Sequence, residues 1–199
     1  IQSLAGQLDS KPVVLALTAT ATPRVQEDIR RALDILNENT VLTGFERSNL
    51  SFQVIKGQNK QKFIDAYVKK NRSVSGIIYC ATRKTVDHLY ERLRQKGIAV
   101  GRYHAGLSAE EREREQDRFL RDEITVMIAT NAFGMGIDKS DVRYVIHAQM
   151  PKNMEGYYQE AGRAGRDGLP SDCLLLHSEQ DVQVQRFLID QSQGDEEHK

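Results

Sequence analysis

Short aliphatic runs alternate along this chain with longer stretches that have the period of an amphipathic helix. Strands that read as nearly continuous aliphatic runs, separated by helices, are typical of a parallel sheet covered on both faces. We therefore predict an α/β three-layer sandwich with a mainly parallel sheet. The predicted strands lie in residues 11–22, 39–44, 49–55, 75–80, 98–106, 125–130, 142–150 and 171–178, and the predicted helices in 23–36, 60–71, 82–97, 108–123, 153–165 and 179–190.

Charge and composition limit the kind of partner. The 28 Lys and Arg residues equal the 28 Asp and Glu residues, so a polyanion would have to meet a local basic patch. No apolar run approaches the roughly 20 residues of a membrane helix, and no charged-then-apolar leader opens the chain, so we expect an intracellular soluble protein. Cys80 and Cys173 lack metal-site spacing, and we predict that both are buried thiols.

Ligands of open α/β sheets sit beyond the carboxyl ends of the strands, so the residues that follow strands are candidates for a site. Thr82 and Arg83 open a helix after a strand, where free N–H groups favour an anion. On this segment alone, an N-cap role for Thr82 with solvated neighbours is the favoured interpretation. His104 follows the next strand, and a lone histidine there is usually structural. The segment 130–139 combines hydroxyl, amide, glycine, carboxylate and lysine side chains, and a flexible loop is the alternative.

The stretch YYQEAGRAGRDG (157–168) is harder to explain structurally. On a helix from about Met154, Gln159 and Arg163 share a face, and Arg166 lies at or past the helix end. Its interior glycines each cost about 1 kcal/mol relative to alanine, which favours close packing or a ligand. Guanidinium groups suit phosphate oxygens. The alternative is that both arginines pair with Glu160 and Asp167 on the surface.

Several of these strings together resemble a known family. They look like the later motifs of superfamily 2 helicases, in the order and spacing of the RecQ DNA helicases, and AFGMGIDK followed by YYQEAGRAGRDGLP is specific to RecQ-like proteins. The strings are LALTATAT (15–22), GIIYCATRK (76–84), YHAGL (103–107), TVMIATNAFGMGIDKSDVR (125–143) and YYQEAGRAGRDGLP (157–170).

The resemblance implies a RecA-like fold and an ATP-dependent helicase that moves 3′ to 5′ on single-stranded DNA, with ATP between two lobes. Residues 1–45 resemble the end of the first lobe, 46–190 the second lobe, and 191–199 are expected to be a polar tail. The family's arginine finger matches Arg166, with Arg163 supporting or contacting the phosphates. The other residues that match the family's nucleotide-binding positions are Gln159, Gly134, Gly136 and Asp138.

Other matched residues concern DNA and coupling. The family grips phosphates of the tracking strand at positions matched by Thr82, Arg83, Tyr103, His104, Gly106, Thr130, Asn131 and Lys139. Thr18 and Thr20 match the element that links hydrolysis to lobe movement. The implied partners are single-stranded and partly duplex DNA and the first lobe of the same protein, in a bacterial cytoplasm at the nucleoid.

Some expected motifs are missing. The sequence has no phosphate-binding loop G-x-x-x-x-G-K-[ST] and no D-E-x-H motif after an apolar strand, where the family carries it, and the string DEEH (195–198) lies in the polar tail. ATP and Mg²⁺ would therefore be bound mainly by the absent first lobe. Two cysteines cannot form the family's zinc cluster, so no zinc or other metal site is expected. Half of a helicase motor is the favoured interpretation. A non-enzymatic nucleic-acid-binding module is the alternative. A nuclease or another superfamily 2 translocase is disfavoured by the RecQ-like fifth and sixth motifs and by the lack of a carboxylate cluster for two metals.

Overall fold

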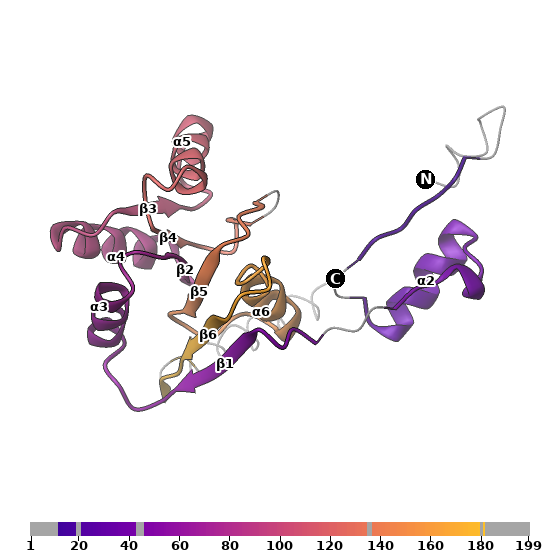
Figure 1. The fold of residues 1–199 in the computed structure, drawn as a ribbon, viewed down its shortest axis with the longest axis horizontal. Coiled ribbons are helices and arrows are strands. Elements are labelled where there is room, and N and C mark those ends of the chain that lie inside the picture. The colour runs from indigo at the N-terminus through magenta and orange to yellow at the C-terminus, as the bar shows by residue number, and fades with distance from the viewer. Residues whose placement is uncertain (1–11, 19–20, 43–45, 135–136, 180, 182–199) are drawn as a thin grey trace, which may run out of the picture. The chain divides into compact units, whose positions relative to one another are not determined.

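The computed structural model describes residues 12–18, 21–42, 46–134, 137–179 and 181 (Figure 1). The chain divides into two compact units, Ile1–Arg47 and Ser48–Lys199.

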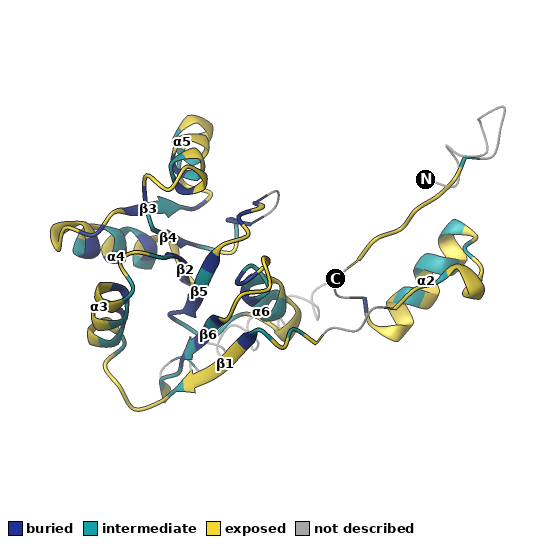
Figure 2. Ribbon diagram, viewed as in Figure 1, coloured by how far each residue is buried: buried dark blue, intermediate teal, exposed yellow. Residues whose placement is uncertain are grey.

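The second unit is built on one six-stranded sheet in the order β1-β6-β5-β2-β4-β3. All five strand pairings are parallel, which confirms the predicted α/β class. Three of the four interior strands, β2, β4 and β5, are almost entirely buried, as expected for a parallel sheet covered on both faces (Figure 2). The strands are β1 (Leu50–Ile55), β2 (Ser75–Tyr79), β3 (Val100–Tyr103), β4 (Val126–Ala129), β5 (Val142–His147) and β6 (Ser171–Leu176).

Helices cover the sheet on both sides and complete three layers. One face packs against α3 and α4, through residues such as Ile64 and Leu89. The other face packs against α5, α6 and the segment 130–141, through residues such as Phe119 and Phe133. The helices are α3 (Lys60–Lys70), α4 (Arg83–Gln95), α5 (Ala109–Leu120) and α6 (Met154–Ala161).

The helix ends of this unit follow from local side-chain chemistry. The predicted capping box opens α5, where Ser108 and Glu111 each accept a hydrogen bond from the other's backbone N–H. Thr82 caps α4 by accepting from the N–H of Thr85. Gly97, with a φ of 70°, follows α4 in a left-handed conformation that glycine adopts without strain.

The helix predicted over residues 153–165 is shorter than expected. It ends at Ala161, and Gly162 to Gly168 form turns. Gly165 has a φ of 55°, and a Cβ there would lie 2.5 Å from Nδ2 of Asn49. A left-handed glycine packed this closely against a neighbouring side chain breaks the helix, so Arg163 and Arg166 lie in turns rather than on a helix face.

The first unit contains α2 (Pro23–Leu33), capped by Thr22, and the short helix η1 (Asn37–Asn39). The strands predicted over 11–22 and 39–44 are absent from the described residues of those segments. A strand needs a hydrogen-bonded neighbour, and no described strand pairs with either segment. Their aliphatic side chains are instead exposed, as at Leu15 and Leu17.

The last predicted helix, 179–190, and the tail 191–199 lie outside the described residues except for Glu179 and Asp181. Among the described helices, none is long and apolar enough to cross a membrane.

Candidate functional site

Arg163 lies against the backbone of the segment that follows β4. Its Nη1 donates to the carbonyl of Gly134 at 2.6 Å. Gly134 has a φ of 147°, and a Cβ on it would fall 2.1 Å from Nη2 of Arg163. Only glycine leaves room for the guanidinium at this point. The Nε of Arg163 is buried and has no hydrogen-bond partner among the described residues.

Arg166 is anchored to the same segment, three and four residues after Gly134. Its Nη1 donates to the carbonyl of Ile137 at 3.0 Å and to Oδ1 of Asp138 at 2.8 Å. The Arg166 side chain is 35% exposed and that of Asp138 88% exposed. An ion pair this accessible is weak, so the guanidinium is positioned but can exchange its carboxylate partner for another anion.

The alternative pairing of these arginines with Glu160 and Asp167 is wrong. Glu160 contacts His147, with 2.8 Å between Oε2 and Nε2. Asp167 accepts two hydrogen bonds from Nη2 of Arg143, at 2.6 and 2.7 Å. The bond from Arg143 holds the pKa of the Asp167 carboxyl below its usual value. Both carboxylates therefore have other partners.

The segment 130–141 connects opposite edges of the sheet. At the carboxyl end of β3, the N–H of Thr130 donates to the carbonyl of Tyr103 at 3.1 Å. At the amino end of β5, the Arg166 loop is attached by the N–H of Gly165, which donates to the carbonyl of Val142 at 2.8 Å. We expected the site residues at the carboxyl ends of the strands. Thr130 lies there, but Arg166 does not, because α6 returns the chain to the amino ends of the strands before the turns that carry Arg163 and Arg166.

A second group of predicted residues gathers at the carboxyl ends of β2 and β3. A Cβ on Gly106 would lie 3.2 Å from Cδ of Arg83, so these residues from different loops are neighbours. Thr82, Arg83, Gly106 and Asn131 are exposed, and Thr130 is half-buried. A hydrogen bond joins the residues just before α4 to those just after β5: the N–H of Ala81 donates to Gln149 Oε1 at 2.9 Å. These exposed groups can meet an anionic backbone.

His104 is structural rather than available to a ligand. Its side chain is 6% exposed, and its Nδ1 accepts from the N–H of Gly106 at 3.1 Å. The ring proton then sits on Nε2, which lies 3.2 Å from Oδ1 of Asp87. Both nitrogens have protein partners, so the geometry argues against the predicted DNA contact of His104.

Lys139 is also placed away from solvent. Its side chain is 5% exposed, and Nζ lies 2.6 Å from Asp122 and 3.0 Å from Asp141. Burial works against the charged form, but the bonds to the two carboxylates outweigh it and raise the pKa of Lys139. This ion-paired lysine fixes the turn before β4, and its burial argues against the predicted contact to DNA.

The other predicted residues have varied positions. Tyr103 is half-buried, with its ring centroid 5.0 Å from that of Phe133. Gln159 is exposed on α6. Thr18 belongs to the first unit, where it lines a cleft of about 920 Å³ whose other walls are mostly aliphatic. Gly136 and Thr20 lie outside the described residues.

Two residues that support the site were not predicted from the sequence. Tyr79 and His147 are register partners at the ends of β2 and β5, and their rings stack with centroids 5.4 Å apart. The Tyr79 hydroxyl donates to the carbonyl of Phe133 at 3.1 Å, next to the glycine that holds Arg163. Burial raises the pKa of Tyr79. The sequence does carry one sign of this pair, since each of the two aliphatic strands ends in a polar aromatic residue.

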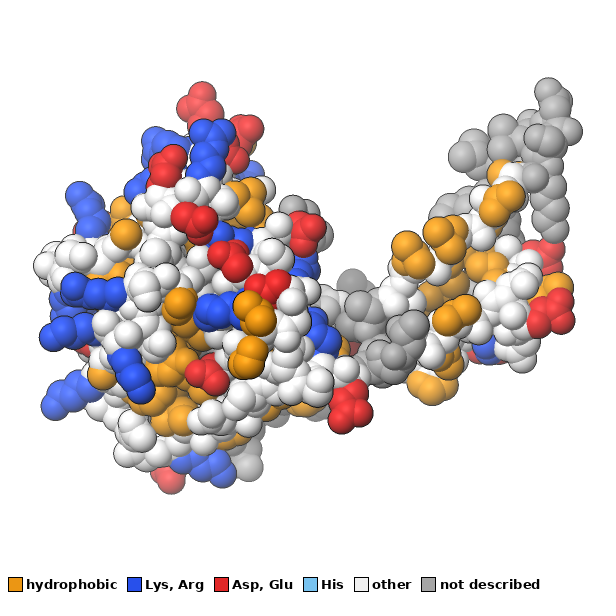
Figure 3. Space-filling model, viewed as in Figure 1, with side chains coloured by type: hydrophobic (Ala, Val, Ile, Leu, Met, Phe, Trp, Pro, Cys, Tyr) orange, Lys and Arg blue, Asp and Glu red, His pale blue; other side chains and the backbone are white. Residues whose placement is uncertain are grey.

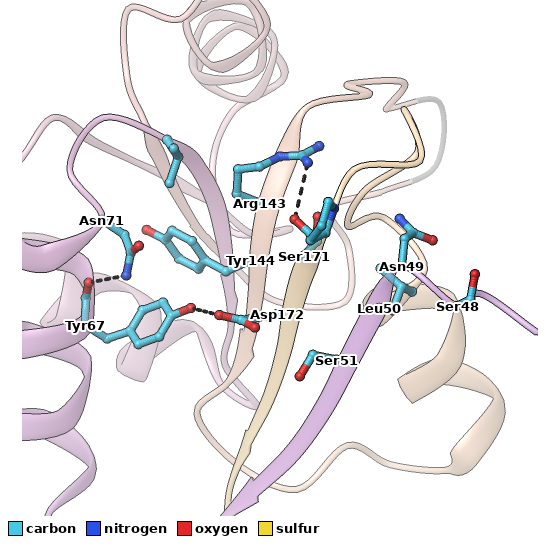
Figure 4. A pocket seen from close by; sticks show the side chains of 12 residues that line it. Ser48, Asn49, Leu50, Ser51, Tyr67, Asn71, Arg143, Tyr144, Ser171 and Asp172 are labelled. Carbon is cyan, nitrogen blue, oxygen red and sulfur yellow. Dashed lines mark hydrogen bonds between the residues drawn. The ribbon is translucent and has the colours of Figure 1, made fainter.

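A separate hollow of about 490 Å³ opens at the amino edge of the sheet, beside the end of α3 (Figure 4). Tyr67 and Asp172 lie across it, joined by a hydrogen bond of 2.5 Å from the Tyr67 hydroxyl. None of the predicted site residues lines this hollow. The candidate site is instead formed by Arg163, Arg166 and the described residues of the segment 130–141 that they contact.

Comparisons with known proteins give matches to helicases. The chain matches the family described as helicase conserved C-terminal domain over residues 58–168. It is 60% identical to an ATP-dependent DNA helicase RecQ of Bacillus subtilis (strain 168), over 100% of this chain and 34% of that protein. It is 45% identical to the RecQ-like DNA helicase BLM of Xenopus laevis, over 93% of this chain and 14% of that protein.

Among solved structures, a DEAD box protein from the hyperthermophile Methanococcus jannaschii aligns with a TM-score of 0.63 at 25% identity. The alignment covers 84% of this chain and 46% of that chain. Of the two curated relatives named above, the chain spans about a third of the Bacillus protein and a smaller share of the Xenopus protein.

Proposed function

Because the chain belongs to the helicase conserved C-terminal domain family, in its RecQ branch, we propose that it supplies the second RecA-like lobe of an ATP-dependent 3′-to-5′ DNA helicase. Residues 46–190 would form that lobe and residues 1–45 the end of the first. The relatives' names support DNA as the substrate, and such a role would place the protein at the nucleoid of a bacterial cytoplasm.

The attachment of Arg163 and Arg166 to one backbone segment carries the proposal. Both guanidinium groups are held by carbonyls of the segment 130–141 rather than by buried carboxylates. Arg166 would act as the arginine finger, neutralising charge that develops on the γ-phosphoryl group of ATP during hydrolysis. Arg163 would support it or contact the phosphates, with Gln159 and Asp138 beside them.

The described residues fit only part of an ATP site. Two positioned guanidinium groups suit phosphate oxygens, but the sequence lacks the phosphate-binding loop. Magnesium would neutralise phosphate charge when bound, and no group of three His, Cys, Asp or Glu among the described residues could hold it. ATP and Mg²⁺ would therefore be bound mainly by the first lobe, and the isolated chain is not expected to hydrolyse ATP.

The carboxyl-edge group would form part of the single-stranded DNA track. Thr82, Arg83, Gly106, Thr130 and Asn131 present hydroxyl, guanidinium, backbone and amide groups to solvent, which suits phosphates without reading sequence. The segment 130–141 begins at this group and ends at the arginines. It gives a direct covalent path by which DNA and nucleotide could influence one another, and Thr18 and Thr20 would act in the same coupling from the first lobe.

The test is ATP turnover by this chain joined to a RecQ first lobe that carries the phosphate-binding loop, with and without single-stranded DNA. We expect DNA to raise turnover, and Arg166→Ala to lower kcat by about 10³-fold, the lower range for loss of an arginine finger. ATP binding should persist in the variant. Arg121→Ala, which removes an exposed arginine from the end of α5, is the matched control and should leave turnover unchanged.

Two other outcomes would count against the proposal. Turnover that responds neither to DNA nor to Arg166→Ala would favour a non-enzymatic nucleic-acid-binding module. Turnover by the isolated chain above a buffer blank, abolished by Arg166→Ala, would show that the phosphates are bound without the first lobe.

A further inference from the structure

The positive charge of this chain is concentrated in one region. Residues 56–96 contain eleven Lys and Arg against three Asp and Glu, a net charge of +8, while the whole chain has a net charge of zero. This region comprises the approach to α3, both helices on one side of the sheet and the strand between them. A local basic patch is what a polyanion needs when the net charge gives no attraction.

The fold directs these charges to one side of the molecule. α3 and α4 pack onto the same core cluster, α3 through Ile64 and Val68. Lys62 and Lys69 are seven residues apart, two helical turns, and therefore share the side of α3 opposite those core residues. Both are exposed. Figure 3 shows Lys and Arg side chains gathered over α3 and α4 at the left of the view.

The three acidic residues of the region do not cancel this charge at the surface, because each has its own partner. Asp65 pairs with Arg92 at 3.2 Å and with Lys96 at 2.5 Å. Asp87 pairs with Arg102 at 2.5 Å, and Glu91 lies 3.7 Å from an Arg94 nitrogen. Seven exposed residues remain that pair with no carboxylate among the described residues. Arg83 belongs to the proposed single-strand track, and we call the other six the α3–α4 basic face: Lys56, Lys62, Lys69, Lys70, Arg72 and Lys84.

The chemistry of this face distinguishes between kinds of nucleic acid. Proteins that hold single strands combine cations with exposed aromatic rings on which bases stack. Phe63 and Tyr67 on α3 and Tyr90 on α4 are turned toward the core and only partly accessible. The face therefore offers charge without stacking surfaces, which fits the outside of a duplex, where phosphates are presented and bases are not.

We propose that the α3–α4 basic face binds the phosphate backbone of double-stranded DNA, as a contact separate from the single-strand track. The rise from Lys62 to Lys69 is about 10 Å, a length over which duplex DNA carries about six charges. Lys84 lies beside Arg83, at the edge of that track, so the duplex contact continues from it. The choice of DNA as the polyanion rests on the proposed function.

The experiment measures binding of the chain to a labelled 20-base-pair blunt duplex and to a 20-nucleotide single strand by fluorescence anisotropy, at several salt concentrations. The test variant combines Lys62→Gln, Lys69→Gln and Lys70→Gln. The control variant removes the same charge elsewhere, through Arg114→Gln, Arg121→Gln and Lys152→Gln. Far-ultraviolet circular dichroism and urea unfolding verify that both variants fold.

We expect the test variant to bind the duplex at least about tenfold more weakly at low salt, with the slope of log K against log salt reduced by about 2 to 3. Its affinity for the single strand should stay within about twofold, because the track is untouched, and the control variant should lose far less duplex affinity than the test variant.

Four results would overturn the proposal: equal losses in both variants, equal losses for duplex and single strand, no duplex binding by the wild-type chain, or equally tight binding of a polyglutamate peptide that the test variant loses. The last would assign the face to an acidic protein. Arg83→Gln tests the proposed track separately, because it should weaken single-strand binding whatever the duplex result.

Discussion

Gly134 is the residue that fixes where Arg163 lies. Its φ of 147°, and the 2.1 Å that would separate an added Cβ from Nη2 of Arg163, exclude any side chain without rearrangement. We predict that Gly134→Ala lowers the free energy of unfolding by about 1–3 kcal/mol through backbone strain. It should also reduce DNA-stimulated ATP turnover of the two-lobe protein at least about tenfold, because the guanidinium is displaced.

Gly97→Ala is the control for strain alone, since Gly97 has a φ of 70° and nothing within 4 Å of a Cβ. It should be destabilised without losing turnover. Full turnover in Gly134→Ala would mean that Arg163 does not depend on this glycine.

The two thiols give a prediction about pH and reactivity. Cys80 and Cys173 are buried and neither is in a disulfide, as predicted from their aliphatic surroundings. Burial disfavours the thiolate and raises the pKa of Cys80 to about 12. Because only the thiolate reacts, and roughly one part in 10⁴ of Cys80 is ionised at pH 8, we expect almost no reaction with Ellman's reagent in the native chain at that pH. Both thiols should react after unfolding in guanidinium, and rapid native labelling of Cys80 would contradict its burial.

At the scale of elements, α6 is fixed to the sheet by a pair of polar groups that no motif revealed. Glu160 on α6 contacts the ring of His147 on β5, which is 1% exposed and stacks on Tyr79. We predict that Glu160→Ala destabilises the protein by about 1–3 kcal/mol, because a buried ring nitrogen loses its partner. Glu160→Gln should recover part of this, since its amide oxygen or nitrogen can still bond to the ring.

The measurement is the free energy of unfolding in urea, with Glu155→Ala as control because Glu155 is exposed on the same helix. Similar losses in Glu155→Ala and Glu160→Ala would show that the pair does not anchor α6. The arginine loop begins directly after this helix, so we also expect a lower ATP turnover in Glu160→Ala of the two-lobe protein.

At the scale of the whole molecule, the two units differ in how much core they have. Both described core clusters consist entirely of residues from Ser48 onward. In the first unit, Val13, Leu17 and Val41 are 83% exposed or more. We predict that a chain of residues 48–199 unfolds in urea with the same free energy as the full chain, to within about 1 kcal/mol, because it keeps its entire core.

The same truncation should reduce binding of the dye ANS, because it removes exposed aliphatic surface. A large loss of stability on truncation would show that residues 1–47 contribute to the core of the second unit.

The sequence by itself determined the parallel sheet, the helices and their caps. These depend on local properties: the period of aliphatic residues, the Ser108–Glu111 capping box, and the conformational freedom of Gly97. The motif residues Arg163 and Arg166 were also recognisable, because their chemistry is carried by the side chains themselves.

Only the tertiary structure decided what these side chains contact. It buried His104 and Lys139 against carboxylates, left residues 12–18 without a strand partner, and placed Arg166 at the amino edge of the sheet. Each outcome depends on groups far apart in the chain. Burial and hydrogen bonding between such groups arise only when the sheet brings them together, so no local pattern contains them.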